Sequence, residues 1–300
     1  MFNISTCWNI EKHEKPEDAF KEIADFGFDG VELSWINEER FAKMKGLKLK
    51  VGSVHSYMPE PMQIKEGRWR NDVYRLTALD EEERKAAVAC TLKTLEVSAG
   101  YGAKAVVVHL GIPEGYVQRS STLFELFAAG KMDSEEFVKI RAEIMEERDL
   151  RKDKYFDLGL KSLEKINTFA SRLKLKIGVE TRFHYEELPG IPEFEFIFRE
   201  FRGGSLGYWH DIGHAESQEK LGFLPHDSYL NALKGDLIGM HIHDMKGLSD
   251  HMAPGTGELK YNKYIDMFKD SAILKVFEVH PFNTKEQVLA GRKMLEQLAQ

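Results

Sequence analysis

The sequence has little cysteine, since Cys7 and Cys90 are its two thiols among 300 residues. Two cysteines are too few for a disulfide framework and form no closely spaced thiol metal motif. Long apolar runs are also missing, and none approaches the ~18 residues of a membrane span. The first residues lack the basic segment and apolar stretch of a signal peptide. We therefore expect a cytoplasmic protein with no membrane partner.

Positive charge is in short supply. The chain has 42 Lys and Arg against 49 Asp and Glu, a net charge of -7, and such a field repels polyanions rather than gathering them. Nucleic acid is not expected as a partner. One local group of basic residues, Arg68, Arg70 and Arg75, is compatible with a phosphate-backbone patch, a solvated loop or an anchor for a sugar phosphate, and the sequence leaves these three open.

What the sequence does contain is a regular alternation of short apolar runs and amphipathic segments, which is typical of an α/β fold. Eight strand and helix pairs favour a closed (β/α)8 TIM barrel over a doubly wound sheet, and one barrel commonly takes about 250 residues. We expect a single domain over residues 1–300. The predicted strands are 2–8, 30–35, 49–57, 101–110, 176–182, 206–210, 237–243 and 274–279. The predicted helices are 15–26, 37–45, 80–100, 156–173, 192–201, 225–233, 261–269 and 284–298.

The connection after the fourth strand is much longer than the short loops that usually join such elements. Within it, residues 121–129 and 134–148 are charged, amphipathic and helical in pattern. The sequence therefore predicts a helical insertion after strand four, over the mouth of the barrel.

Potential metal ligands recur where the predicted strands end. Side chains at the carboxyl ends of barrel strands converge although they are far apart in sequence. A buried carboxylate or imidazole without a partner costs several kcal/mol, so a repeated occurrence favours one shared site. Mixed carboxylate and imidazole ligands suit a divalent ion, with Mn or Zn favoured and Co, Mg or Fe compatible. The residues are His55, His109, Glu180, Asp211, His241 and Glu278.

Taken singly, each of these histidines is more often structural than a ligand, and it is the joint pattern that favours a site. His210 and His243 lie beside the chosen ligands, and each is equally compatible with a supporting or a purely structural role. We expect His13 and His226 to lie in solvent.

Four ordered motifs contain these candidate ligands. They are Gly178-Val179-Glu180, Trp209-His210-Asp211-Ile212-Gly213-His214, Gly239-Met240-His241-Ile242-His243-Asp244 followed by Asp250-His251-Met252-Ala253-Pro254-Gly255-Thr256-Gly257, and Phe277-Glu278. With these motifs the chain resembles, over nearly its whole length, the sugar phosphate isomerase/epimerase group of the xylose isomerase-like TIM barrels. The resemblance implies one divalent metal held by Glu180, Asp211, His241 and Glu278, and a substrate contact from His214.

The same superfamily contains apurinic endonucleases, which build a three-zinc cluster. His55, His109, His214 and His251 match the additional ligand positions, so an endonuclease-like phosphodiesterase is the main alternative. The endonuclease motif places an Asp where this chain has Ser249, and Asp250 is adjacent instead. That departure and the acidic charge favour a single ion, with the four histidines left for substrate contacts or secondary metal ligation.

The resemblance implies a divalent-metal-dependent isomerase or epimerase that acts on a small carbohydrate: a sugar, a sugar phosphate or an inosose. A proton would leave the carbon next to a carbonyl, pass through an enediolate and return, with Glu180 and Glu278 as base and acid. A hydride shift and a non-catalytic sugar-binding barrel are further alternatives. Arg182 and Lys246, with His184, are placed to fix hydroxyls or a phosphate, and Glu32 and Trp35 to line the pocket. A homo-oligomer is compatible with the sequence.

Overall fold

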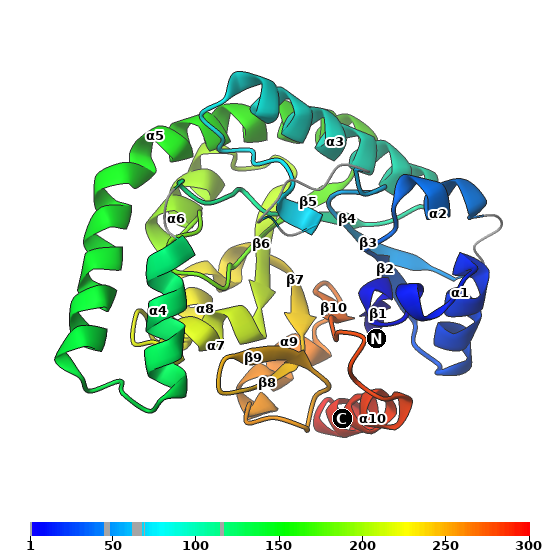
Figure 1. Cartoon of the computed structure of the whole chain (residues 1–300). Coiled ribbons are helices and arrows are strands. Elements are labelled where there is room, and N and C mark those ends of the chain that lie inside the picture. The colour runs from blue at the N-terminus through cyan, green and yellow to red at the C-terminus, as the bar shows by residue number, and fades with distance from the viewer. Residues whose placement is uncertain (1, 45–48, 62–67, 69, 115–116) are drawn as a thin grey trace.

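The computed structural model describes residues 2–44, 49–61, 68, 70–114 and 117–300, without the side chains of 117 and 118. Its strands close into a parallel barrel in the order β1-β10-β7-β6-β5-β4-β3-β2. The outer helices form an arc around the strands (Figure 1). The predicted (β/α)8 TIM barrel is confirmed. The barrel strands are β1 (Asn3–Ser5), β2 (Gly30–Leu33), β3 (Val51–His55), β4 (Ala105–Val108), β5 (Lys176–Glu180), β6 (Leu206–Asp211), β7 (Leu237–Ile242) and β10 (Leu274–Phe277).

Several helices begin at residues whose side chains satisfy free backbone donors. The Asp80 side chain accepts from the amide of Glu83, and Thr284 forms a reciprocal capping box with Gln287. Pro16 opens the first helix, where a missing N–H costs nothing. The helices are α1 (Pro16–Asp25), α2 (Glu38–Lys43), α3 (Glu81–Gly100), α4 (Val117–Ala128), α5 (Glu135–Leu173), α6 (Ile191–Glu200), α7 (Ile212–Lys220), α8 (Asp227–Leu233), α9 (Ile265–Lys269) and α10 (Lys285–Leu298).

Several predicted boundaries were wrong. The first strand stops at Ser5 and the chain turns into a 3-10 helix over Thr6–Trp8. The helix predicted over 261–269 begins as a 3-10 turn, Tyr261–Tyr264, before α9. The predicted helices 134–148 and 156–173 are one helix, α5, of 39 residues. No proline interrupts the stretch, and pairs such as Arg151 with Glu147, at 2.8 Å, carry the helix through its charged middle.

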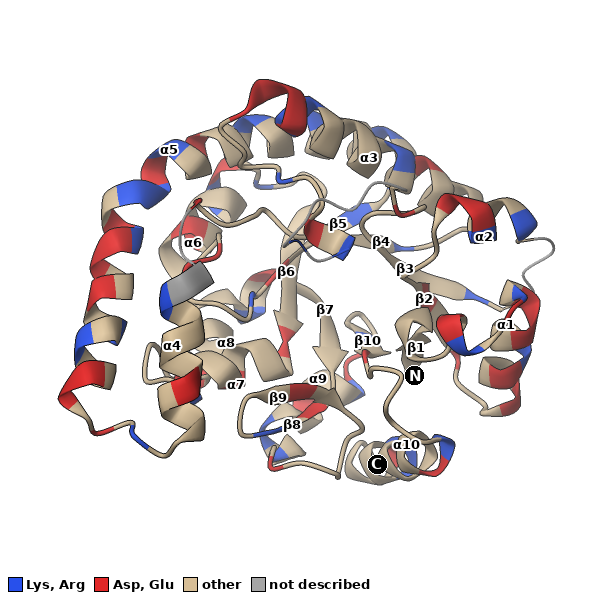
Figure 2. Cartoon of the chain, viewed as in Figure 1, with Lys and Arg blue, Asp and Glu red and all other residues tan. Residues whose placement is uncertain are grey.

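The chain between β4 and β5 forms a helical hairpin from α4 and the first half of α5 (Figure 1). Leu123, Phe137 and Ile144 pack there with Leu221 and Phe223, which follow α7, in an apolar cluster separate from the main core. Residues 121–128 and 135–148 are helical, as the amphipathic pattern predicts. Acidic and basic residues interleave along α5 rather than gathering by sign (Figure 2).

Two elements were missed by the sequence reading, and both carry site residues. Helix α7 begins directly after Asp211, whose side chain accepts from the amide of His214 at 2.7 Å. A two-stranded antiparallel sheet pairs β8 (Asp244–Lys246) with β9 (Ser249–Met252). Helix α7 begins inside the motif that ends at His214, and β8 and β9 overlap the motifs 239–244 and 250–257.

The floor of the barrel is a buried tryptophan. Trp209 on β6 lies between Gly178 of β5 and Gly239 of β7, and a Cβ atom at Gly239 would stand 2.1 Å from the indole. At Gly178 the same atom would stand 2.6 Å away. The indole packs edge to face against His241, with ring centroids 5.2 Å apart. The absence of a side chain at Gly178 and Gly239 thus leaves room for the Trp209 indole directly beside His241, a candidate metal ligand.

None of the helices among the described residues combines the length and the apolar character that a membrane crossing requires.

Candidate functional site

Four predicted ligands meet at the carboxyl end of the barrel. Glu180 and Asp211 end β5 and β6, His241 is the penultimate residue of β7, and Glu278 directly follows β10. One ligand atom from each lies within 4.8 Å of the others. All four are buried, with relative exposures of 0% for the first three and 6% for Glu278. Three carboxylates this close and this dry require a cation, because an unpaired buried charge is strongly unfavourable.

His241 lies at the centre of this group. Its Nδ1 is 2.5 Å from Glu180 Oε1, 3.1 Å from Glu278 Oε2 and 3.7 Å from Asp211 Oδ2. Burial alone lowers the pKa of His241, but Glu278, Glu32 and Glu180 together raise it well above its usual value. In the protein without a bound ion, a proton on this imidazole therefore serves as the cation of the cluster.

Glu32 fixes the orientation of His241. Its carboxylate oxygens lie 3.2 and 3.3 Å from His241 Nε2, and Ser53 Oγ donates to the same carboxylate at 2.8 Å. With Nε2–H donating to Glu32, Nδ1 faces the three acidic ligands and would bind an ion once its proton has left. A carboxylate behind a ligating imidazole is the usual way in which proteins set its tautomer and raise its basicity.

A second group consists of His55, His109 and Glu180. His109 Nε2 is 2.6 Å from Glu180 Oε2, and His55 Nε2 is 3.7 Å from the same atom. Asp72 orients His109 from behind, at 3.0 Å from Nδ1.

Arg182 supplies a positive charge within this second group. Its Nη1 is 2.5 Å from His109 Nε2 and donates to Glu180 Oε2 at 3.0 Å. Its Nε donates to Glu187 at 2.9 Å, and Nη2 is 3.5 Å from Asp72. Burial lowers the pKa of Arg182, but Glu187, Asp72 and Glu180 more than reverse that effect and raise it. The Arg182 guanidinium thus contacts His109 Nε2 and Glu180 Oε2, the two atoms that an ion in the second group would use as ligands.

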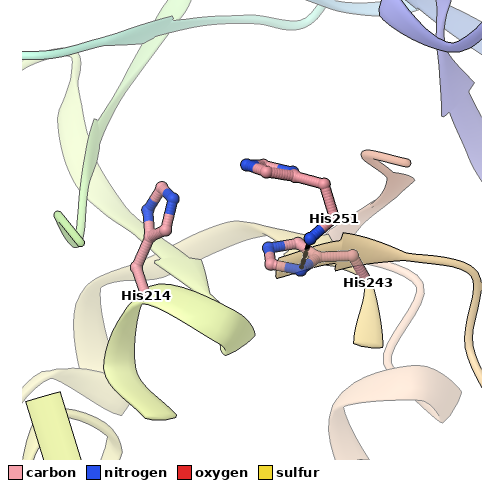
Figure 3. Close-up of side chains that lie close together, drawn as sticks. All are labelled: His214, His243 and His251. Atoms are coloured by element: carbon pink, nitrogen blue, oxygen red, sulfur yellow. Dashed lines mark hydrogen bonds between the residues drawn. The ribbon is translucent and has the colours of Figure 1, made fainter. Parts of the chain in front are cut away.

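A third group brings together His214 on α7, His243 directly after β7, and His251 on β9 (Figure 3). The amide of His251 donates to His243 Nδ1 at 3.0 Å, so His243 Nε2 carries the proton and donates to Asp211 at 3.0 Å. His243 therefore positions the Asp211 carboxylate. Of the two roles that the sequence left open for His243, this contact favours the one in which it supports a neighbouring ligand.

The other two histidines of the third group keep one nitrogen free for a ligand. His214 Nδ1 donates to the carbonyl of Thr181, and His251 Nδ1 donates to the carbonyl of Glu278, both at 2.9 Å. Asp250 Oδ2 lies 3.9 Å from His214 Nε2 and 3.6 Å from His251 Nε2. Such separations suit ligands that share one ion at bond lengths near ~2.1 Å. Asp250 thus lies beside the free nitrogens of both imidazoles.

Comparison with known proteins fixes the family. A family model described as the xylose isomerase-like TIM barrel matches residues 20–298. The chain belongs to this family.

Solved structures share the fold of this xylose isomerase-like barrel. A 3-keto-D-glucoside 4-epimerase from E. coli superimposes with a TM-score of 0.67 at 15% identity, covering 99% of this chain and 98% of the other. An L-ribulose 3-epimerase gives 0.68 at 14%, covering 100% and 95%. The IOLI protein with a bound zinc atom gives 0.65 at 12%, covering 99% and 97%. No curated protein matches the sequence.

In this xylose isomerase-like barrel, Lys246, His13, His210 and His226 lie away from the four predicted metal ligands or in separate hydrogen-bond networks. Lys246 is exposed at the end of β8, and among the described residues no hydrogen bond or ion pair joins it to the four ligands. His226 is buried, so its predicted solvent position was wrong. It sits 2.5 Å from Tyr264 Oη and 3.1 Å from Glu216. His210 contacts His226 at 3.2 Å in the same buried network. His13 is partly exposed and pairs with Glu22.

Sequence reasoning missed Asp72 and Glu187 altogether. Both act through Arg182 and His109, and neither lies at a strand end: Asp72 is in a 3-10 turn (Arg70–Asp72) after β3, and Glu187 is in the loop between β5 and α6. No periodicity marks such loop positions. For Glu187 the close spacing Arg182 to Glu187 was the one available signal, and it is a weak one.

We expect Glu32→Gln to weaken divalent metal binding roughly ten- to hundredfold, the usual effect of losing a carboxylate behind a ligating imidazole. The amide keeps the volume but cannot hold the Nε2 proton as strongly. Competition with a chelator dye measures the affinity. Exposed Glu200→Gln, at the far end of α6, is the matched control. Unchanged affinity in Glu32→Gln would mean that His241 does not ligate through Nδ1.

Proposed function

We propose that this protein is a divalent-metal-dependent isomerase or epimerase of a small carbohydrate. The observation that carries the proposal is the buried group of Glu180, Asp211, His241 and Glu278, whose ligand atoms lie within 4.8 Å of one another. The solved epimerases that share its fold support the same class of reaction.

The donor set suits one divalent ion. Three carboxylates and one imidazole fit Mn or Zn, and Co, Mg or Fe are compatible with the same ligands. When bound, such an ion supplies a Lewis acid that favours negative charge on the oxygens of an enediolate. Four protein ligands leave positions open for substrate on an ion that accepts five or six.

Glu180 and Glu278 are the proposed proton-transfer pair. They approach His241 Nδ1 from β5 and from the end of β10, on different sides of the barrel mouth. Burial and the neighbouring Glu180 raise the pKa of Glu278, whereas His241 and His109 outweigh burial and keep the pKa of Glu180 well below its usual value. In the protein without a bound ion, the two carboxyls thus differ in proton affinity, as acid and base roles require.

Arg182, His109 and His55 line the next part of the site. Their nitrogen atoms surround Glu180 Oε2 at 2.6 to 3.7 Å, so they both restrain this carboxylate and offer donors to substrate hydroxyls. His243 restrains Asp211 in the same way. We assign these residues the task of positioning.

The test is a screen of ketoses, aldoses, inososes and their phosphates with the protein stripped of metal and then loaded with Mn, Co, Zn or Mg. Reactions run in D2O separate the two chemical routes. Proton transfer places solvent deuterium next to the carbonyl, and a hydride shift leaves that carbon unlabelled. Metal-dependent interconversion with deuterium uptake is the expected result. Interconversion without label would retain the isomerase and remove the paired-glutamate mechanism.

An endonuclease-like phosphodiesterase is the second candidate, and the placement of His214, Asp250 and His251 favours it. Their geometry suits a further ion, and the His55, His109 and Glu180 group would add another. Against this, Arg182 already brings its charge to that group, and the chain is acidic overall. Elemental analysis after chelator-free purification decides between them. We expect one ion per chain and no salt-sensitive DNA binding; three zinc equivalents with nicking of abasic DNA would favour the endonuclease.

A further inference from the structure

A cavity of about 150 Å³ adjoins the proposed catalytic site. Since a water occupies roughly 30 Å³ in the liquid, this space admits a small oxyanion. Its wall includes Asp72 and Glu187, the two carboxylates that hold Arg182 against Glu180. The cavity and the ligand Glu180 are therefore separated by a single layer of side chains. We call it the arginine pocket, after Arg68 and Arg75 in its lining.

The carboxylates of the arginine pocket already have cationic or N–H partners. Asp72 accepts from His109 at 3.0 Å and faces Arg182 at 3.5 Å. Glu187 accepts from Arg182 Nε and from the amide of His184, both at 2.9 Å. Because both carboxylates are already paired, they do not require a cationic ligand in the pocket.

Arg75 is the unmatched charge of the pocket. Among the residues that the structure describes, no carboxylate lies within 4.0 Å of its guanidinium, although Asp72 and Glu187 line the same cavity. Its Nε is buried without a hydrogen-bond partner, and Nη1 has one long contact, 3.5 Å, to the carbonyl of Ile112. A half-buried guanidinium left this way is unfavourable unless a bound group completes it.

The fold holds Arg75 in this position. Gly111, with φ of +132°, packs against its stem so closely that a Cβ atom would stand 3.0 Å from Arg75 Cβ. The amide of Arg75 donates to Glu83, which also pairs with Arg68. Burial and the like charge of Arg68 lower the pKa of Arg75, and the more distant charges of Asp72, Glu83 and Glu187 offset this only in part. An anion in the pocket would relieve both effects.

The remaining polar lining is compatible with an anion. The His184 ring stacks on Phe124, with centroids 5.3 Å apart, and both face the pocket. Ser120 lines the same wall and donates to Glu186. Arginine forks match the paired oxygens of phosphate and carboxylate, which a neutral hydroxyl does not offer.

We propose that the arginine pocket binds the anionic end of the substrate, so that the protein acts on an anionic carbohydrate, a sugar phosphate or a sugar carboxylate, held through Arg75. This rests on the proposed carbohydrate function for the position of the other end of the molecule. The binding of an anion by Arg75 does not itself depend on turnover.

The experiment measures binding to the metal-loaded protein by calorimetry with three probes: D-fructose, D-fructose 6-phosphate and D-glucuronate. We expect one anionic probe to bind at least tenfold more tightly than fructose, and inorganic phosphate to compete with it if that probe is the phosphate. Arg75→Gln should weaken that probe roughly ten- to hundredfold and leave fructose within twofold. Arg202→Gln, an exposed arginine in the turn after α6, is the matched control and should change nothing.

If thermal unfolding shows that Arg75→Gln folds poorly, Arg75→Lys takes its place. This variant keeps a positive charge but loses the paired N–H donors of the guanidinium, so it should retain part of the preference for the anionic probe. Equal binding of all three probes to the wild-type protein, or a preference that survives in Arg75→Gln, would overturn the proposal. An Arg75-dependent preference without any isomerisation would support the anion site and contradict the proposed function. Turnover of neutral sugars with no preference for an anionic probe would support the proposed function and contradict the anion site.

Discussion

Glu180→Gln and Glu278→Gln should each lower kcat by roughly a thousandfold or more. Proton transfer by a positioned side chain is worth about 10² to 10⁴ in rate, and each substitution also removes a charged ligand. The amide retains the volume of the carboxylate, so the fold should persist. Initial rates at saturating metal, together with metal content after gel filtration, give the measurement.

The matched control is Glu200→Gln, which removes an exposed carboxylate at the end of α6. The two active-site variants should differ from it in rate and not in unfolding temperature beyond a few degrees. Activity within a few-fold of wild type in either variant would remove that glutamate from the mechanism.

Asp211→Asn and His241→Ala should abolish stoichiometric metal binding, because ligand loss precedes any chemistry. Asn keeps Oδ1 as the acceptor for the amide of His214, so the cap of α7 survives and the loss reports the charge. Added metal stabilises a protein that binds it by about 2.7 kcal/mol at a hundred times Kd. We expect that stabilisation in the wild type and its disappearance in both variants.

Elemental analysis and thermal unfolding with and without metal provide the data. Exposed Asp25→Asn on α1 is the matched control and should keep the wild-type response. Full metal content in both ligand variants would show that the ion sits elsewhere, with the His214, Asp250 and His251 group as the next place to substitute.

The ligands at the strand ends could be predicted because one rule links sequence to space. Parallel barrel strands end at the same face, so Glu180, Asp211, His241 and Glu278 could be assigned to one region from the chain alone. Their convergence within 4.8 Å agrees with that expectation.

Contacts that depend on register across the barrel could not be predicted. Glu32 was placed near the pocket, but its bond to His241 joins strands 209 residues apart in the chain. Asp72 and Arg75 lie in or beside a loop whose path follows no period, so their relation to Arg182 and the cavity appears in the fold alone. His226 was expected to lie in solvent, but it is enclosed by Glu216 on α7 and by Tyr264, 38 residues further along the chain.

The tryptophan floor bears on how this barrel can change over time. A side chain at Gly178 or Gly239 collides with the indole of Trp209, and a smaller residue at 209 leaves a void beside His241. Each single replacement is therefore penalised, while a joint exchange of bulk among the three positions is not. We expect the three to covary among relatives, as residues in direct contact do. A relative that lost the indole at position 209 would also need new side chains at positions 178 and 239 to fill the space beneath His241.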